Sequence, residues 1–186
     1  DYNMGIRNSF RYKNIDFGFL IDMQKGGVYR SLTNIWGHYS GILESTAANN
    51  IREDGIVVEG VTGDVTYNND GSYTVTNTAP NTTVISAQRW GQDYFFGNDA
   101  QNVFAADYWK LREVNLGYTL PKDWMGESGI QSVRFSAFGR NLLVWGLDND
   151  NFDPEVATGG SGNIQGSEGG SLPSTRTYGL NVEIKL

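Results

Sequence analysis

Cysteine is absent from this chain of 186 residues, which also contains only four prolines and one histidine. Without cysteine, the protein has neither a disulfide scaffold nor a zinc site that depends on thiolates. Basic residues are also few, because 14 lysines and arginines stand against 21 acidic residues, for a net charge of −7. A nucleic acid would be repelled by that charge, so we expect no nucleic-acid partner.

Long apolar runs are missing as well. No stretch of the sequence approaches the ~18 apolar residues of a membrane-spanning helix, so any membrane would have to be crossed by strands. Glycine is abundant instead, with 24 residues, and aromatic residues make up 13% of the chain. Many glycines among aromatic-rich segments are typical of an all-β protein with frequent turns.

Alternation of apolar and polar residues is the dominant pattern. It occupies five segments, namely 2–12, 14–25, 106–120, 130–143 and 175–186. A period of two predicts strands with one apolar and one polar face. The last segment alternates without exception, whereas Asn8, Leu20 and Phe138 interrupt three of the others. No segment predicts a helix longer than the single turn that 122–127 could form.

The connections between these segments alternate in length. A tight turn at Lys13-Asn14 and a short connection at 121–129 alternate with long loops at 26–105 and 144–174. Short turns at one end and long loops at the other are typical of antiparallel transmembrane β-barrels. Within the first long loop, residues 65–75 predict a small hairpin around Asp70-Gly71.

A soluble β-sandwich would show similar alternation and remains an alternative, for example as a carbohydrate-binding module. Three features favour the barrel. Large residues occupy the apolar strand faces, aromatic residues lie near strand ends, and the chain stops on the last apolar residue of its most regular strand. Five strands are too few to close a membrane barrel, so either several copies each donate strands or the N-terminal part of the barrel is missing. The sequence begins within a strand and shows no export signal, so we expect most of the barrel to lie upstream of Asp1.

Several blocks resemble segments of SusC/RagA-type TonB-dependent transporters, and they occur in the same order. The run DYWKLREVNLGYTLP at 107–121 resembles the family's "KLR-x-(hydrophobic)-x-LGY-x-(L/F)-P" segment. The other matching blocks are GRNLL at 139–143, FDPEV at 152–156, TRTYGLNV at 175–182, YKN at 12–14 and QKGG at 24–27. In one departure, the last residue is Leu186, where many outer-membrane strands end on an aromatic residue.

The resemblance implies a fold and partners. Such proteins form outer-membrane barrels of about twenty-two strands with a plugged lumen, in Gram-negative bacteria. They take energy from TonB, pair with a SusD-like surface lipoprotein and import oligosaccharides or peptides. By this resemblance, the plug and the segment that contacts TonB would lie N-terminal to Asp1. An adhesin or a passive porin with a similar barrel is a further alternative.

The aromatic residues of the loop 26–105 are candidates for binding. The candidates for contact with substrate or lipoprotein are Trp36, Tyr39, Trp90, Tyr94 and Phe95, with Phe96 beside them. Exposed aromatic rings stack on sugars, but they also anchor a folded loop or a protein interface. We favour anchoring or contact with the lipoprotein.

Other candidate sites are weak. The acidic run 148–153 has the oxygen spacing of a calcium loop, but Phe152 and Asp153 stand where an EF-hand needs an oxygen ligand and glycine. No helix follows the glycines at 159–162, so we expect no phosphate cradle there. His38 lacks a recognisable metal-ligand partner nearby in sequence. We therefore expect no catalytic residue, cofactor or metal, and no enzyme.

Overall fold

The computed structural model describes residues 1–155 and 165–186. The glycines at 159–162 lie outside the described residues. The chain divides into two compact units, one formed by 1–30 and 103–186 and the other by 31–102. Each unit is described by itself below. Among the residues that the structure describes, no helix is both long and apolar enough to cross a membrane.

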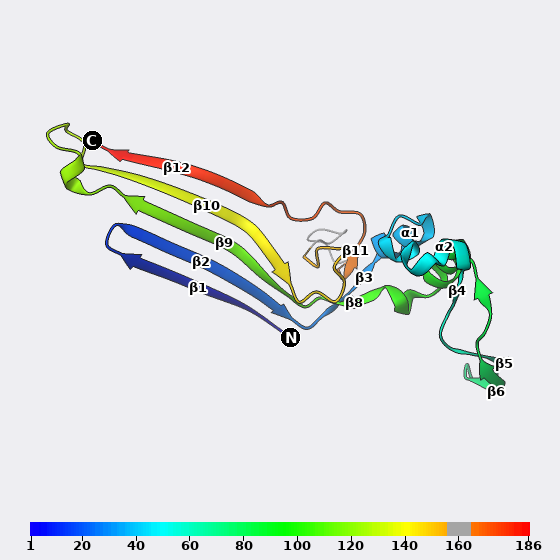
Figure 1. The fold of residues 1–186 in the computed structure, drawn as a ribbon. Helices are drawn as coiled ribbons and strands as arrows, with labels where there is room; N and C mark the ends of the chain where they lie inside the picture. The colour runs from blue at the N-terminus through cyan, green and yellow to red at the C-terminus, as the bar shows by residue number, and fades with distance from the viewer. Residues whose placement is uncertain (156–164) are drawn as a thin grey trace. The chain divides into compact units, whose positions relative to one another are not determined.

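The first unit is built on a five-stranded antiparallel sheet (Figure 1). In spatial order its strands are β1 (Tyr2–Tyr12), β2 (Ile15–Lys25), β9 (Tyr108–Thr119), β10 (Ser132–Trp145) and β12 (Thr177–Lys185). These strands coincide with the five alternating segments, and the antiparallel all-β class predicted from the sequence is confirmed. A single 3₁₀ turn, η5 (Lys122–Trp124), joins β9 to β10.

The register places like residues side by side on each face of the sheet. One row runs from Phe17 in β2 through Leu116 and Ala137 to Leu180 in β12. The neighbouring row on the other face runs through Asp16, Gly117, Ser136 and Asn181. The alternation of each strand is therefore in phase with that of its neighbours, and the sheet has one continuous apolar face and one polar face.

A bulge in β9 keeps this phase. Leu20 lies opposite Glu113 and Ile21 lies opposite Leu111, so Arg112 has no residue opposite it. The extra residue brings Trp109 and Leu111, at odd positions, onto the same face as Val114 and Leu116, at even positions. The apolar positions change from odd to even along β9, and the strand continues through this irregularity.

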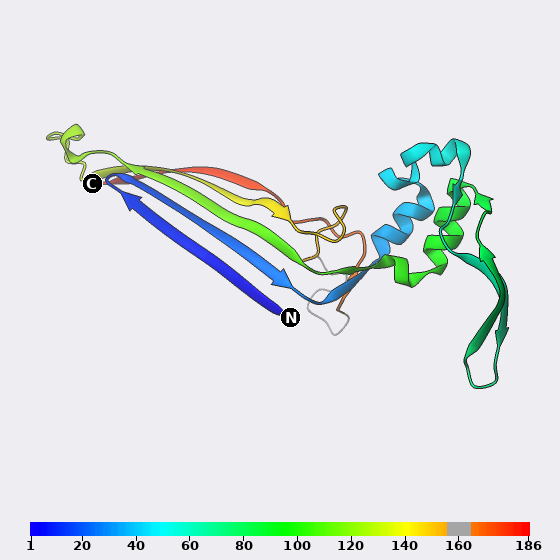
Figure 2. The same cartoon turned by 60° about the horizontal axis from the view of Figure 1, so that its bottom comes forward.

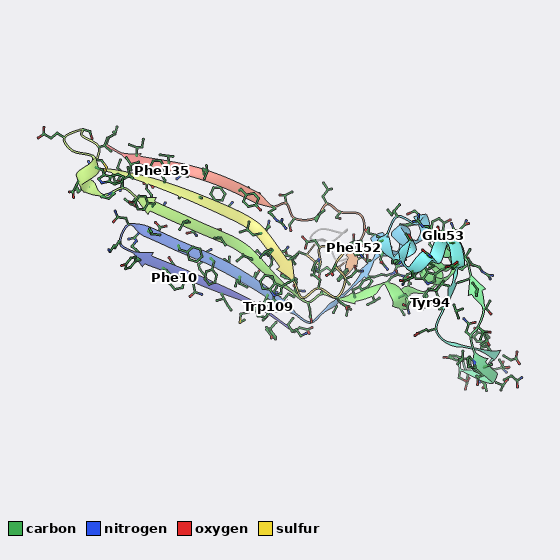
Figure 3. All side chains as sticks on the ribbon, viewed as in Figure 1. Phe10, Glu53, Tyr94, Trp109, Phe135 and Phe152 are labelled. Carbon is green, nitrogen blue, oxygen red and sulfur yellow. The ribbon has the colours of Figure 1, made fainter. Side chains whose placement is uncertain are left out.

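None of the described residues covers the apolar face of the sheet. Leu180 and Tyr178 are 86% and 71% exposed, and Phe10 and Phe135, labelled in Figure 3, are about half exposed. Water-soluble monomers rarely expose an apolar patch of this extent, because hiding apolar surface from water drives folding. The core of the unit is correspondingly small.

On the polar face, Gly117 lies beneath an ion pair that crosses three strands. Arg134 in β10 reaches over β9 to Asp16 in β2, with 2.6 Å between Nη2 and Oδ2. A Cβ at position 117 would lie 2.4 Å from that Nη2. Phe138, which interrupts the alternation of β10, also lies on this face, where its ring covers Gly179 and is itself approached by Arg140.

A smaller sheet completes the unit. Its strands, in spatial order, are β11 (Ser167–Glu168), β3 (Val28–Ser31) and β8 (Val103–Ala105). Tyr29 is buried among Phe104 and nearby carboxylates, and burial together with the charge of Glu168 raises the pKa of its hydroxyl to about 12.

The second unit combines short helices with a hairpin. Its elements are α1 (Leu32–Ser40), η1 (Glu44–Thr46), η2 (Ala48–Asn50), α2 (Ile51–Asp54), β4 (Ile56–Val57), β5 (Val61–Tyr67), β6 (Tyr73–Pro80), β7 (Val84–Ile85), α3 (Ala87–Arg89), the π-helix η3 (Trp90–Phe95) and η4 (Asp99–Asn102). The hairpin predicted around Asp70-Gly71 is present as β5 and β6. Figure 2 shows this hairpin extending away from the helices of its own unit.

The expectation of no helix beyond one turn is wrong at α1. The side chain of Ser31 caps this helix by accepting the Asn34 N–H at 3.0 Å, and Gly41 ends it with a φ of 73°. A serine that caps the first turn and a left-handed glycine after the last turn are the usual boundaries of a helix, and nine helical residues lie between them here. The helix is short, however, and its stability comes from packing on η3, which periodicity alone does not reveal.

Candidate functional site

The predicted aromatic residues of the second unit fall into an exposed group and a packed group. Trp36 and Tyr39 lie one turn apart on the exposed side of α1, and Phe96 follows η3. Their ring centroids are 5.4 to 5.5 Å apart in every pair. All three side chains are between 41% and 54% exposed. We call Trp36, Tyr39 and Phe96 the aromatic platform.

The packed group lies between α1 and η3. The ring of His38 stacks on Phe95, with 3.7 Å between centroids, and Trp90 meets both rings edge-on. Tyr94 contacts Phe95 in the same way at 5.4 Å. Trp90 and Phe95 therefore pack between the two helices, whereas the side chains of Trp36 and Tyr39 are exposed.

Gly91 allows this close approach of the two helices. A Cβ at position 91 would lie 2.2 Å from the carbonyl oxygen of His38, a distance that no side chain tolerates. The alternation of apolar and polar residues does not mark Gly91. A glycine directly after Trp90, within an aromatic-rich segment, was the available signal.

His38 has a structural role in this unit. Its Nδ1 donates to the carbonyl oxygen of Asn34 at 2.9 Å, which leaves Nε2 to accept the hydroxyl proton of Ser45 at 3.0 Å. Burial lowers the pKa of His38, and the bond to Asn34 only partly opposes this, so the ring is neutral at pH 7. In the described part of the chain, no three acidic or histidine side chains are placed to hold a metal ion.

A pocket of about 560 Å³ lies beside the aromatic platform. Tyr39 belongs to both, and the other main lining residues are Thr46, Arg52, Ser86, Gln88 and Gln92. The guanidinium of Arg52 is held by the carbonyl oxygens of Thr46, at 3.1 Å, and Gly41, at 2.7 Å. The pocket thus presents amide, hydroxyl and guanidinium groups beside the rings of Tyr39 and His38.

Acidic residues outnumber basic residues in the second unit, but none of them lines this pocket among the described residues. The acidic side chains of the unit are Glu44, Glu53, Asp54, Glu59, Asp64, Asp70, Asp93 and Asp99, and its basic ones are Arg52 and Arg89. Most of the net charge of the chain therefore lies in this unit. Since no carboxylate borders the pocket among the described residues, its chemistry suits an uncharged ligand better than a cationic one.

The acidic run 148–153 uses its oxygens within the protein. Asp148 accepts the backbone N–H of Ala105 at 2.8 Å, and Asn149 accepts that of Asn151 at 2.9 Å. Asp153 binds Lys110 and Ser174. These contacts occupy the carboxylates of Asp148 and Asp153, two of the three acidic side chains in the run.

The sequence of the chain is similar to two receptors from Formosa agariphila. It is 29% identical to TonB-dependent receptor P3 over 191 aligned residues, covering 100% of this chain and 16% of that protein. It is 31% identical to TonB-dependent receptor P26 over 188 residues, covering 98% of this chain and 17% of that protein. The chain thus spans about one sixth of the length of these curated relatives. No protein-family model matches the chain.

The fold is similar to part of two solved structures. The RagAB peptide importer in its open-open state aligns with a TM-score of 0.61 at 14% identity, covering 99% of this chain and 17% of that one. A second RagAB peptide transporter structure aligns with a TM-score of 0.57 at 15% identity, covering 96% and 16% of the two chains. At these identities the likeness concerns the fold alone.

Proposed function

Because the chain is a segment of a SusC/RagA-like TonB-dependent receptor, we propose that it serves TonB-dependent uptake across the outer membrane of a Gram-negative bacterium. The relatives are named as receptors and importers, and none is named as an enzyme. The observation that carries the proposal is the five-stranded sheet with one broad, exposed apolar face and one polar face. Such a sheet is suited to a barrel with lipid outside and a hydrated lumen inside.

The dimensions of the sheet support a membrane span. Trp109 and Trp145 stack at one end of the apolar face, with 6.2 Å between their centroids, and Tyr118 lies near the other end. Tyr118 lies opposite Ile15 and Trp109 lies opposite Met23 in the regular strand β2, a separation of eight residues or roughly 27 Å. A strand tilt of about 40° reduces this to roughly 21 Å, comparable to the ~25 Å apolar band of outer-membrane barrels.

The edges of the sheet support membership of a larger barrel. Among the described residues, β1 and β12 each pair on one side only. In lipid, an open edge would leave backbone N–H and C=O groups without partners, so we infer that both edges pair with further strands. By the family resemblance, the whole barrel has about twenty-two strands and a plug that responds to TonB.

We place the second unit outside the membrane, as a contact for a SusD-like surface lipoprotein. The aromatic platform is exposed, and the hairpin of β5 and β6 is exposed along its whole length. An isolated two-stranded hairpin is marginally stable in water, so a partner that covers it would stabilise it. Aromatic residues are also enriched at protein interfaces.

The pocket beside Tyr39 favours a second role, in substrate contact. Between the two substrate classes of the family, a lining of amide and hydroxyl groups with Arg52 and without a carboxylate suits a neutral oligosaccharide better than a cationic peptide. An aromatic ring at the rim of a polar pocket stacks on the apolar face of a sugar ring.

The partner assignment can be tested with the full-length receptor and its lipoprotein. Replacing Trp36 and Tyr39 together by alanine removes two exposed rings, and we expect co-purification of the lipoprotein to fall severalfold. Trp124→Ala is the matched control, because Trp124 is 71% exposed but lies in the turn after β9. Equal co-purification from both variants would contradict a lipoprotein contact at the platform.

A further inference from the structure

An ion cluster lies on the polar face, at the end of the sheet where β9 begins. Its centre is Lys110, whose side chain is only 3% exposed. The ammonium group of Lys110 contacts both carboxylate oxygens of Asp153 at 3.3 Å, a carboxylate oxygen of Glu155, and the hydroxyl of Ser174 at 3.1 Å. Figure 3 labels Trp109, the strand neighbour of Lys110, and Phe152, the chain neighbour of Asp153.

Arg112 extends the cluster to a second strand. Its guanidinium donates to Asp22 of β2, at 3.0 Å from Nε and 2.9 Å from Nη2, and to Glu155, at 2.7 Å from Nη1. Tyr108 donates its hydroxyl proton to the same Glu155 at 2.8 Å. Three side chains of β9 therefore converge on one carboxylate of the β10–β12 connection. Arg112 is the residue that the bulge of β9 leaves without a residue opposite.

The carboxylates of Asp153 and Glu155 remain ionised at neutral pH, because the pKa of each lies below its ordinary value. Burial works against the charged form of Asp153, but hydrogen bonds from Ser174 and from the Glu155 N–H, with the charge of Lys110, hold its pKa below the ordinary value. Burial opposes the ionisation of Glu155 as well, and bonds from Arg112, Lys110 and Tyr108 keep its pKa low. The ion pairs therefore persist through the pH range in which a surface protein works.

The contacts fasten the β10–β12 connection near both of its ends. Asp153 and Glu155 lie soon after β10, and Ser174 lies shortly before β12. The N–H of Ser174 also donates to Asp153 at 3.1 Å, so both ends meet at Lys110. The side chain of Lys110 thus binds residues near both ends of the connection and holds them together.

Net stability is a weak explanation for such a cluster. A buried ion pair gives little stability over an apolar pair of the same size, whereas loss of one partner is costly because the other charge stays buried and unpaired. The cluster therefore fixes the position of the β10–β12 connection more than it adds stability. It holds the connection in one position as long as all of its charged side chains are present.

We propose that Lys110, Arg112, Asp153 and Glu155 form a latch that holds the 153–155 turn on the polar face of the sheet. This proposal rests on the proposed barrel, in which that face lines the lumen. The latched turn then narrows the lumen beside β9, and opening the latch frees the turn without loss of the barrel. Lys110 and Arg112 from β9 bind the carboxylate of Glu155, Asp22 from β2 shares Arg112 with it, and Asp153 of the same turn accepts the Glu155 N–H.

The test uses the full-length receptor in its membrane or in detergent. Lys110→Met removes the central charge at similar length, and Glu155→Gln keeps the shape of the side chain and removes its charge. Arg140→Met is the matched control, because Arg140 lies on the same polar face but is 61% exposed and stands 3.8 Å from Glu113. Hydrogen–deuterium exchange of peptides covering 148–155 and 165–176 reports the state of the turn.

We expect exchange in these peptides to rise about tenfold in Lys110→Met and by a smaller factor in Glu155→Gln, with Arg140→Met like the wild type. The strands β9, β10 and β12 should stay protected in all three variants. Unchanged exchange around Glu155 would overturn the latch, and so would an equal rise throughout the strands, which would mean that the cluster holds the sheet itself. A receptor that behaves as a water-soluble monomer would instead overturn the proposed barrel.

Discussion

Gly117 offers a sharp test of how the polar face is built. A Cβ at this position would lie 2.4 Å from Nη2 of Arg134, and 2.5 and 2.6 Å from the carboxylate oxygens of Asp16. In Gly117→Ala the strand can remain in place, because the crowded atoms are the ends of flexible side chains. The ion pair between Asp16 and Arg134 must open instead.

The expected cost follows from that ion pair. Arg134 makes two hydrogen bonds to Asp16, at 2.6 and 3.3 Å, and the side chains are 33% and 19% exposed. A hydrogen bond to a charged group contributes about 1.5–3 kcal/mol, and partial exposure reduces this. Added methyl groups in packed sites cost about 1–3 kcal/mol. Both approaches give a loss of about 2 kcal/mol in the free energy of unfolding.

The assay is urea unfolding of the full-length receptor in lipid vesicles. Gly5→Ala is the control, because position 5 is on the same face and its nearest side-chain atoms are 3.9 Å away. Gly117→Ala should also be made in an Asp16→Asn, Arg134→Gln background, where its cost should fall well below 1 kcal/mol. If the cost were the same in both backgrounds, the ion pair would not be the reason for glycine at this position.

Two further predictions concern the membrane and the partner. Val182 lies opposite Phe135 on the apolar face and Asn181 lies opposite Ser136 on the polar face, so Val182→Arg should cost about 2–4 kcal/mol in a bilayer and Asn181→Arg should be nearly neutral. Unfolding in vesicles measures both, and equal costs would contradict a lipid-facing Val182. Deleting Gly60–Ala79, most of the exposed hairpin, should weaken co-purification of the lipoprotein and leave barrel assembly intact, because loops contribute little to strand pairing. Normal co-purification would remove the hairpin from the interface.

Strand content was readable from the sequence because the signal is local. Successive residues of a strand point to opposite faces of the sheet. When one face is apolar, apolar and polar residues therefore alternate along the sequence. The exception at Phe138 has a tertiary reason, because Gly179 on the next strand makes room for its ring on the polar face. The bulge at Arg112 likewise depends on the pairing of β9 with β2, which no local pattern shows.

The helical part of the second unit was not readable in the same way. Helix α1 is short, and its position depends on η3, which approaches closely only because residue 91 is glycine. The sequence shows that aromatic residues are concentrated in the loop 26–105. Their division into packed rings such as Phe95 and exposed rings such as Trp36 required the contact between two segments far apart in the chain.

The ion cluster shows the same limit most clearly. The pattern of residues along the chain predicts the strands, their two faces, and the two family-like blocks that contain Lys110 and Glu155. The contact between these blocks follows from the folding of the chain in three dimensions, since 45 positions separate the two residues. Alternation records which face a residue occupies, but it carries no information about which distant charge will neutralise it. The charged partners come together when the strands pair and the β10–β12 connection folds onto them.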